Sequence, residues 1–181
     1  MIYVALLRGI NVGGNNTISM KQLAETFSDL GLQNVKTFIN SGNIIFSDTT
    51  QSSQKLESML ETAIKKNFGM KIKVLLRDLQ NITEVAKKLP ANWFNDTTMK
   101  CDVLFLWEDV DSPKVLDQLI IKAKIDEVKY VSGAVLWRVD RENVTKSGLL
   151  KIIGTKLYKQ MTIRNCNTVR KLLTLMQDVT E

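Results

Sequence analysis

Apolar residues recur along the first half of the chain with the spacings of four strands and two helices. Runs of apolar or alternating residues predict strands at 2–7, 35–39, 44–47 and 71–77. Helical spacing of apolar residues predicts two helices, each followed by a glycine, at 20–30 and 54–68. The first half is therefore expected to have the order β-α-β-β-α-β.

The second half shows similar patterns in the same order. Strands are predicted at 101–107, 128–131 and 134–139, with a short edge strand at 161–163. Helices are predicted at 81–89, 113–124, 147–160 and 168–177. Both halves contain a Ser-Gly turn that follows an aromatic residue and precedes two aliphatic residues and another aromatic, at 38–46 and 130–137. This repeat predicts a duplication; the alternatives are a chance match and the chemistry that hairpin turns share.

The predicted fold class is α+β, with two packed ferredoxin-like (βαββαβ) units whose antiparallel sheets carry helices on one face. We place the N-terminal unit at 1–77, a helical connection at 78–100, and a C-terminal unit with an extra helix at 101–181. In this topology the loop after the first strand and the hairpin between the next two strands emerge at the same end of the sheet. Residues 8–16 and 40–43 are therefore expected to be neighbours.

The composition narrows the chemistry that this fold can perform. The 181 residues include no histidine and two cysteines, Cys101 and Cys166. Without histidine the chain has no Ser-His or Cys-His catalytic pair and no imidazole metal ligand. Two cysteines do not make a four-ligand zinc site, and they favour a reducing compartment over a disulfide scaffold. We expect no metal and no cofactor, and lean towards a protein that is not an enzyme.

The positive charge is concentrated in one stretch. Lysine and arginine number 25 against 19 acidic residues, a net charge of +6, and residues 141–171 contain eight basic residues and one acidic residue. Such a stretch forms either a solvated helical face or a surface that attracts phosphate-bearing partners. No uncharged apolar run approaches the roughly 18 residues of a membrane span. The first strand lacks the charge order of a signal peptide, so a cytoplasmic location without membrane contact is expected.

Three motifs together give the chain a family resemblance. They are Leu-Leu-Arg-Gly-Ile-Asn-Val-Gly-Gly at 6–14, Ser-Gly-Asn at 41–43, and Thr-Ile-Arg-Asn-Cys-Asn-Thr at 162–168. In this order and spacing they resemble the bacterial family called domain of unknown function 1697, over essentially the whole chain. The resemblance implies two ferredoxin-like subdomains and no assigned activity. The family pattern has a tryptophan where this chain has Cys166.

The loop after the first strand is the first candidate binding site. Gly13 and Gly14 allow sharp turns that expose backbone N–H groups, and Arg8 adds a planar cation. The loop and the neighbouring hairpin also supply neutral hydrogen-bonding groups from Asn11, Ser41, Gly42 and Asn43. This set suits a phosphate or a carboxylate. Alternatively, these residues only form the turns, and Arg8 binds carbonyl groups of the hairpin.

The start of the last helix is the second candidate site, with Arg164, Asn165, Asn167 and Thr168. Either asparagine suits the N-cap position, and the positive end of the helix beside Arg164 would attract an anion. Alternatively, the asparagines only cap the helix and Arg164 pairs with a carboxylate. Cys166 could be a nucleophile at this helix end, but the tryptophan of the family pattern favours a packing role.

These residues predict non-catalytic binding of an anionic, phosphate-bearing small ligand. Arginine, asparagine, serine and backbone N–H groups bind anions more readily than they perform bond chemistry. One alternative is sequence-tolerant binding of nucleic acid through the basic stretch at 141–171. Another is a structural or protein-interaction module. The sequence indicates no oligomeric state.

Overall fold

The chain folds into two compact units that each contain one four-stranded sheet. The computed structural model describes residues 1–179. The first unit comprises Met1–Gln80 together with the described residues from Leu172 onward, and the second comprises Asn81–Lys171. The protein is thus a mixed α+β protein with two antiparallel sheets.

The division between the units differs from the boundaries predicted at 77 and 100. Helix α3 (Leu79–Lys88) starts at the end of the first unit, and the connection from Asn81 onward belongs to the second. The described residues from Leu172 onward belong to the first unit. The sequence pattern missed this because it identifies elements, whereas the units are defined by contacts between distant residues.

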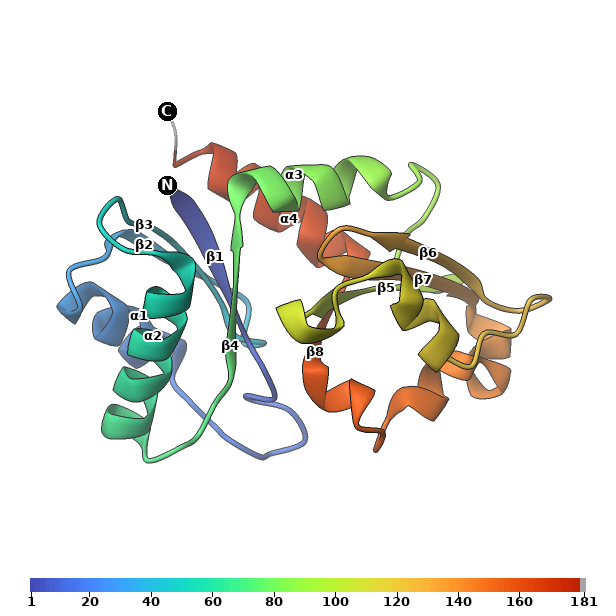
Figure 1. Ribbon diagram of the computed structural model, residues 1–181, viewed down its shortest axis with the longest axis horizontal. Helices are drawn as coiled ribbons and strands as arrows, with labels where there is room; N and C mark the ends of the chain where they lie inside the picture. Colours follow the sequence, from blue (N-terminus) through green and yellow to red (C-terminus); the bar gives the residue numbers. More distant parts are fainter. Residues whose placement is uncertain (180–181) are drawn as a thin grey trace. The chain divides into compact units, whose positions relative to one another are not determined.

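In the first unit, two helices cover one face of the sheet (Figure 1). Its elements are β1 (Ile2–Leu7), α1 (Met20–Asp29), β2 (Gln33–Phe38), β3 (Asn43–Ser47), α2 (Ser53–Phe68) and β4 (Val74–Asp78). The strand order is β2-β3-β1-β4, with every neighbouring pair antiparallel. The predicted strands and helices of this half are confirmed, although β4 begins at Val74 and not at residue 71.

An apolar core holds the two helices on the sheet. Alternate strand residues, among them Ala5, Leu7 and Phe46, face the helices because side chains of a strand alternate between its faces. From α2 the core receives three fully buried side chains at four-residue spacing, Leu56, Leu60 and Ile64. That spacing places them on one side of the helix, so the apolar pattern of the sequence determines which side packs.

Helix α2 also provides hydrogen-bond acceptors for backbone N–H groups at one edge of the sheet. β4 is an edge strand, and an edge strand exposes backbone N–H groups on its unpaired side. The carboxylate of Glu61 accepts a hydrogen bond from the N–H of Val74 at 2.9 Å, and Glu57 accepts one from Leu76 at 2.8 Å. These two carboxylates therefore fix the position of α2 relative to β4.

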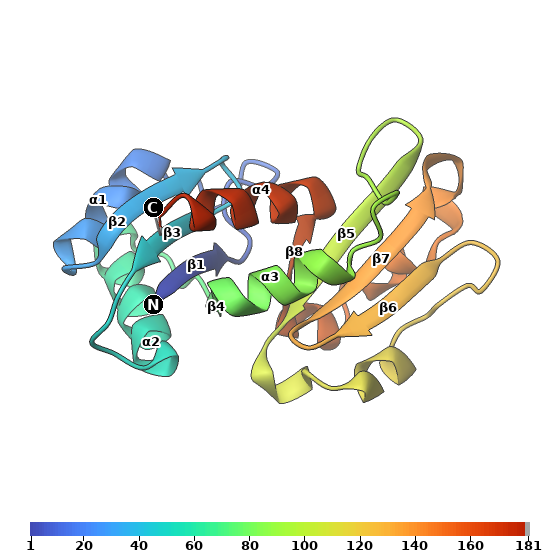
Figure 2. The same ribbon diagram turned by 90° about the horizontal axis from the view of Figure 1, so that it is seen from above.

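The sheet of the second unit has the same strand order as that of the first, but the segments between its strands differ from those of the first unit. Its strands are β5 (Met99–Leu106), β6 (Glu127–Val131), β7 (Ala134–Asp140) and β8 (Met161–Asn165), in the order β6-β7-β5-β8. Figure 2 shows β5, β7 and β6 side by side. Helix α4 (Cys166–Gln177) follows β8. The strands predicted for this half, including the edge strand, are confirmed.

The helices predicted at 113–124 and 147–160 are wrong. The structure has short 3-10 helices instead: η1 (Glu108–Val110), η2 (Pro113–Gln118), η3 (Arg141–Lys146), η4 (Gly148–Ile152) and η5 (Leu157–Gln160). The backbone becomes extended at Leu119, and Gly154 adopts a left-handed conformation with φ 87°. Both conformations interrupt a regular helix.

The buried carboxylate of Asp126 connects these irregular segments. Its Oδ1 accepts hydrogen bonds from the Ser147 hydroxyl and from the indole N–H of Trp137 at 3.1 Å. Its Oδ2 accepts the backbone N–H groups of Lys122 and Gly148, both at 2.9 Å. Burial raises the pKa of Asp126, but the hydrogen bonds together lower this pKa below its ordinary value. Asp126 is thus a common hydrogen-bond acceptor for segments that do not form regular helices.

Candidate functional site

The loop after β1 and the β2–β3 hairpin are neighbours, as the predicted topology requires. The N–H of Leu7 donates to the carbonyl of Gly42 at 2.8 Å. The side-chain amide of Asn11 donates to the carbonyl of Asn40, also at 2.8 Å. The loop and hairpin residues of the first candidate site are therefore brought together at one end of the first sheet.

Within this cluster the asparagine side chains bind the backbone of the protein itself. Asn11 accepts from the N–H of Ile18 at 2.8 Å and donates to its carbonyl at 3.1 Å. Asn43 is fully buried and donates to the Phe38 carbonyl and the Ser41 hydroxyl, both at 3.0 Å. These contacts support the alternative in which the amides form the turns.

Gly42 is required for its small size as well as its backbone conformation. At its φ of 78°, a Cβ atom would lie 2.8 Å from the Leu7 Cβ and the Ile10 Cδ1. Gly13 has a similar φ of 58° with nothing within 4 Å of such an atom. Gly42 therefore needs both the small size of glycine and a left-handed backbone, whereas Gly13 needs only the left-handed backbone.

Gly42→Ala is expected to lower the free energy of unfolding by about 2–3 kcal/mol, because steric overlap adds to the left-handed backbone cost. Gly13→Ala, the matched control, is expected to lose only about 1–2 kcal/mol from the backbone cost. Urea unfolding of both variants measures this difference. Equal losses would show that only the backbone conformation of Gly42 matters.

Arg8 lies beside lysines that the sequence interpretation did not single out. Leu7 pairs with Val74 in the β1–β4 ladder, and the N–H of Arg8 donates to the carbonyl of Lys73 at 3.0 Å. Leu7 and Val74 belong to the core on the helix side, so alternation places the side chains of Arg8 and Lys73 on the other side. Lys71 lies two residues earlier, beyond the buried Ile72. We call Arg8, Lys71 and Lys73 the cationic cluster.

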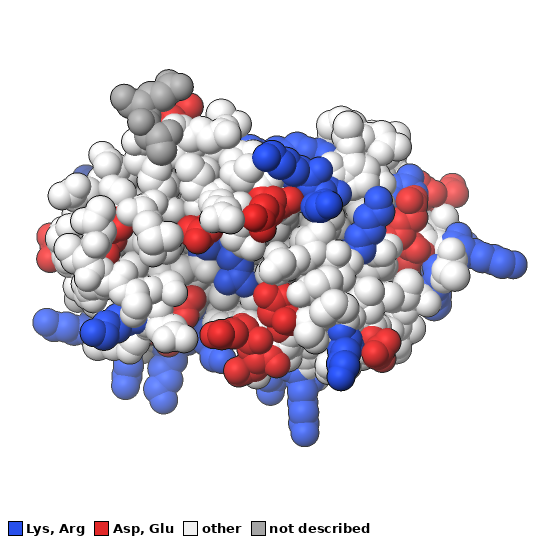
Figure 3. Space-filling model, turned by 45° about the horizontal axis from the view of Figure 1, so that its top comes forward, with Lys and Arg blue, Asp and Glu red and all other residues white. Residues whose placement is uncertain are grey.

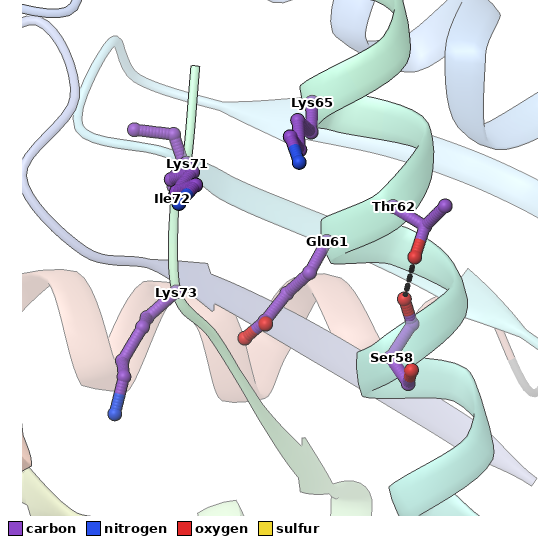
Figure 4. Close-up of a pocket in the computed structure, with 7 residues that line it drawn as sticks. All are labelled: Ser58, Glu61, Thr62, Lys65, Lys71, Ile72 and Lys73. Atoms are coloured by element: carbon purple, nitrogen blue, oxygen red, sulfur yellow. Dashed lines mark hydrogen bonds between the residues drawn. The ribbon is translucent and has the colours of Figure 1, made fainter.

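A hollow of about 360 Å³ lies between α2 and the segment that leads into β4. Its lining residues are Ser58, Glu61, Thr62, Lys65, Lys71, Ile72 and Lys73. Figure 4 shows Glu61 pointing from α2 towards the strand, whereas the side chain of Lys73 points away from α2. Lys65 and Lys71 form no ion pair within residues 1–179. Lysines therefore surround this hollow, and its one carboxylate already accepts a backbone N–H.

A second hollow, of about 390 Å³, lies beside the start of α1. Two residues of the predicted site, Asn11 and Gly14, line it, together with Thr17, Ile18, Ser19, Met20 and Asn40. Ser19 caps α1 by accepting a hydrogen bond from the N–H of Gln22 at 3.4 Å. The predicted loop thus borders a concave surface at a helix N-terminus.

At the second predicted site the polar side chains are engaged within the second unit. Arg164 is buried and donates to the Thr162 hydroxyl at 3.0 Å, and burial lowers its pKa to about 10. Asn165 accepts the N–H of the buried Thr168 at 2.9 Å, so Asn165 is the capping asparagine. Asn167 instead binds the backbone N–H and carbonyl of Asn95 at 3.2 and 2.9 Å. These contacts support the capping alternative.

The arginines of the basic stretch also bind the protein itself. Arg141 donates to the Asp96 carbonyl at 2.8 Å, and Arg170 donates to the carbonyls of Trp93 and Pro90 at 2.7 and 2.9 Å. Five exposed lysines remain as the outward charge of this stretch: Lys146, Lys151, Lys156, Lys159 and Lys171. On the face shown in Figure 3, basic and acidic side chains are interspersed.

The comparisons with known proteins agree with this architecture. The chain is similar over 97% of its length to a conserved bacterial protein from Streptococcus pneumoniae, SP0830, with 30% identity, a TM-score of 0.81 and coverage of 98% of that chain. No curated protein matches. Within residues 1–179, no helix has the length and apolar character of a membrane span. Residues 1–137 match the model described as "Protein of unknown function (DUF1697)", and the chain therefore belongs to that bacterial family.

Proposed function

We propose that the protein binds an anionic, phosphate-bearing small ligand at the cationic cluster, without catalysing a reaction. The cluster holds Arg8 and Lys73 opposite each other at the ends of paired strands, with their backbones joined by a hydrogen bond of 3.0 Å. An arginine fork and neighbouring ammonium groups supply the donors and charge that phosphate oxygens accept. Lys65 and Lys71 add charge around the adjacent hollow.

A comparison between the two units carries this proposal. In the second unit Trp107 donates to the Gln160 carbonyl at 3.1 Å, in the same relation as Arg8 to Lys73. Just before these positions, Leu106 donates to Gly133 as Leu7 donates to Gly42, at 2.9 and 2.8 Å. The shared backbone geometry therefore does not require charged side chains. We propose that the cations found at these positions in the first unit serve to bind an anion.

The same equivalence supports a common origin of the two units. Both sheets have the same strand order, and in both a glycine with φ near 80° follows a serine in the hairpin: Gly42 at 78° and Gly133 at 86°. We propose that both units are variants of one ferredoxin-like unit, and that the second lost its α-helical cover. On this proposal the binding function belongs to the first unit alone.

A titration with inorganic pyrophosphate tests the proposed function. A ligand at 100 times its dissociation constant stabilises the folded state by about 2.7 kcal/mol, so the melting temperature is expected to rise by several degrees. The double variant Lys71→Ala/Lys73→Ala, which changes only exposed side chains, is expected to abolish the rise, and so is Arg8→Ala. Lys66→Ala on α2, outside the cluster, is the matched control and should retain it.

Sodium chloride at equal ionic strength controls for charge screening. If pyrophosphate raises the melting temperature of the double variant as much as that of the wild type, the cluster is not the site. If pyrophosphate does not raise the melting temperature of the wild type, the protein does not bind phosphate groups at the concentrations used.

We propose nucleic-acid binding as the second candidate, because the exposed lysines of residues 141–171 remain available to phosphates. Such binding is electrostatic, so it should weaken steeply as salt is raised. It would depend on Lys151 and Lys156 and not on Lys71 and Lys73. The two candidates therefore require different residues.

A further inference from the structure

The β5–β8 ladder brings the two cysteines of the chain together. Asp102 of β5 pairs with Asn165, the last residue of β8, and the two cysteines come next: Cys101 precedes Asp102 in β5, and Cys166 begins helix α4. Both thiols are free and fully buried, and each is the largest single influence on the pKa of the other. Two residues that are 65 positions apart in the sequence thus form a buried dithiol.

The surroundings of the two sulfur atoms differ. Cys166 is the first residue of the 12-residue helix α4, and its Sγ lies 3.8 Å from a guanidinium nitrogen of Arg170 and 3.6 Å from the Trp93 carbonyl oxygen. The hydrogen bond from Cys101 and the charge of Arg170 lower the pKa of Cys166 against the effect of burial. The pKa of Cys101 is raised by that hydrogen bond and by burial. Cys166 is therefore the thiol that loses its proton more readily, and Cys101 is the one that keeps it.

We propose that Cys101 and Cys166 are a redox modification site, at which hydrogen peroxide converts the two thiols into an intramolecular disulfide. The Cys166 thiolate attacks one oxygen of the peroxide, the O–O bond breaks, and the released hydroxide takes a proton to become water. The resulting sulfenic acid is attacked by the sulfur of Cys101. An S–S bond forms, the S–O bond breaks, and the Cys101 proton leaves with the hydroxide as a second water. The peroxide is reduced by two electrons, and the two thiols supply them.

The backbone geometry permits this bond with a small movement. Paired strand residues such as Asp102 and Asn165 have Cβ atoms about 4.5–5.5 Å apart, the two cysteines come directly after this pair, and a disulfide needs a Cβ–Cβ distance of about 3.5–4.5 Å. The approach would move the first turn of α4, where Asn167 binds Asn95 and Arg170 binds the Trp93 carbonyl. The loop around Trp93 should therefore change its environment on oxidation.

The test is to expose the native full-length chain to hydrogen peroxide, block remaining thiols with iodoacetamide after unfolding, and measure the intact mass. The expected product has lost about 2 Da and carries no alkyl group, as two thiols joined by a disulfide require. Peptide mapping should join the peptides of Cys101 and Cys166, and non-reducing electrophoresis should show a monomer. Cys101→Ala should leave no disulfide and, with dimedone, a sulfenic acid adduct at Cys166.

Two results would overturn the proposal. In the first, both thiols of the peroxide-treated wild type remain fully alkylated after unfolding. In the second, the only disulfides join different molecules. Both readouts use the wild-type chain, so they hold even if a cysteine variant folds poorly. Recovery of the original tryptophan fluorescence on addition of dithiothreitol would distinguish the reversible disulfide from irreversible damage.

Discussion

Gly148→Ala is expected to unfold the second unit or to destabilise it by on the order of 4 kcal/mol or more. A Cβ atom at this position would lie 1.5 Å from the carbonyl oxygen of Ile120 and 2.6 Å from its carbonyl carbon. Both are backbone atoms, so no side-chain rotation relieves the overlap. The segments also cannot separate freely, because Asp126 binds the N–H groups of Gly148 and Lys122.

Tryptophan fluorescence during urea unfolding measures this effect, since all three tryptophans, at 93, 107 and 137, lie in the second unit. Gly154→Ala is the matched control: Gly154 has a left-handed φ of 87° and no atom within 4 Å of an added Cβ. It should lose only about 1–2 kcal/mol. A Gly148→Ala protein as stable as the Gly154 variant would contradict the close packing of Gly148 on Ile120.

Asp126→Asn is the second substitution with a large expected effect. The two side chains have the same shape, but an amide nitrogen donates where a carboxylate oxygen accepts. Whichever way the amide is turned, its nitrogen would face two of the four donors that Asp126 binds. Each buried donor left without an acceptor costs about 1–3 kcal/mol, so we expect a loss of about 3–5 kcal/mol. Asp117→Asn, an exposed control, should change stability by less than about 0.5 kcal/mol.

The same carboxylate predicts how stability depends on pH. The pKa of Asp126 is lower in the folded protein than the ordinary value of about 3.9. Its contribution to stability is therefore fully present above that ordinary value and is lost as the pH falls through the lower, folded-state pKa. Between pH 5 and pH 2, the wild type should lose more stability than Asp126→Asn. Parallel losses in the two proteins would show that Asp126 does not contribute in this range.

The predictable elements of this fold were those determined by local patterns. The continuous apolar run of β1 and the four-residue apolar spacing of α2 are properties of neighbouring residues, and the structure confirms both elements. The conformation of the segments that connect the strands of the second sheet depends on contacts between distant residues, such as that of Gly148 with Ile120. A helical pattern at 147–160 carries no information about that contact, so the prediction of a regular helix failed there.

The candidate site shows the same limit. The predicted topology was sufficient to place the loop at 8–16 beside the hairpin at 40–43. It did not reveal that the amide of Asn11 is bound by Ile18 and Asn40, because hydrogen-bond partners require coordinates. The sequence interpretation missed Lys73 because it did not include the register between β1 and β4. The two lysines that flank Ile72 could have indicated a positively charged strand end. The cysteine pair likewise depends on the β5–β8 register.

Titration of the ¹⁵N-labelled protein with inorganic pyrophosphate, followed by amide chemical shifts, tests the binding proposal most directly. The amide signals of Arg8, Gly9 and Lys73 are expected to move together along one saturating curve. The signals of Trp107 and Gln160, which occupy the equivalent backbone positions of the second unit, should stay in place. Equal shifts at both pairs, or shifts spread over the exposed lysines without saturation, would contradict a phosphate site at the cationic cluster.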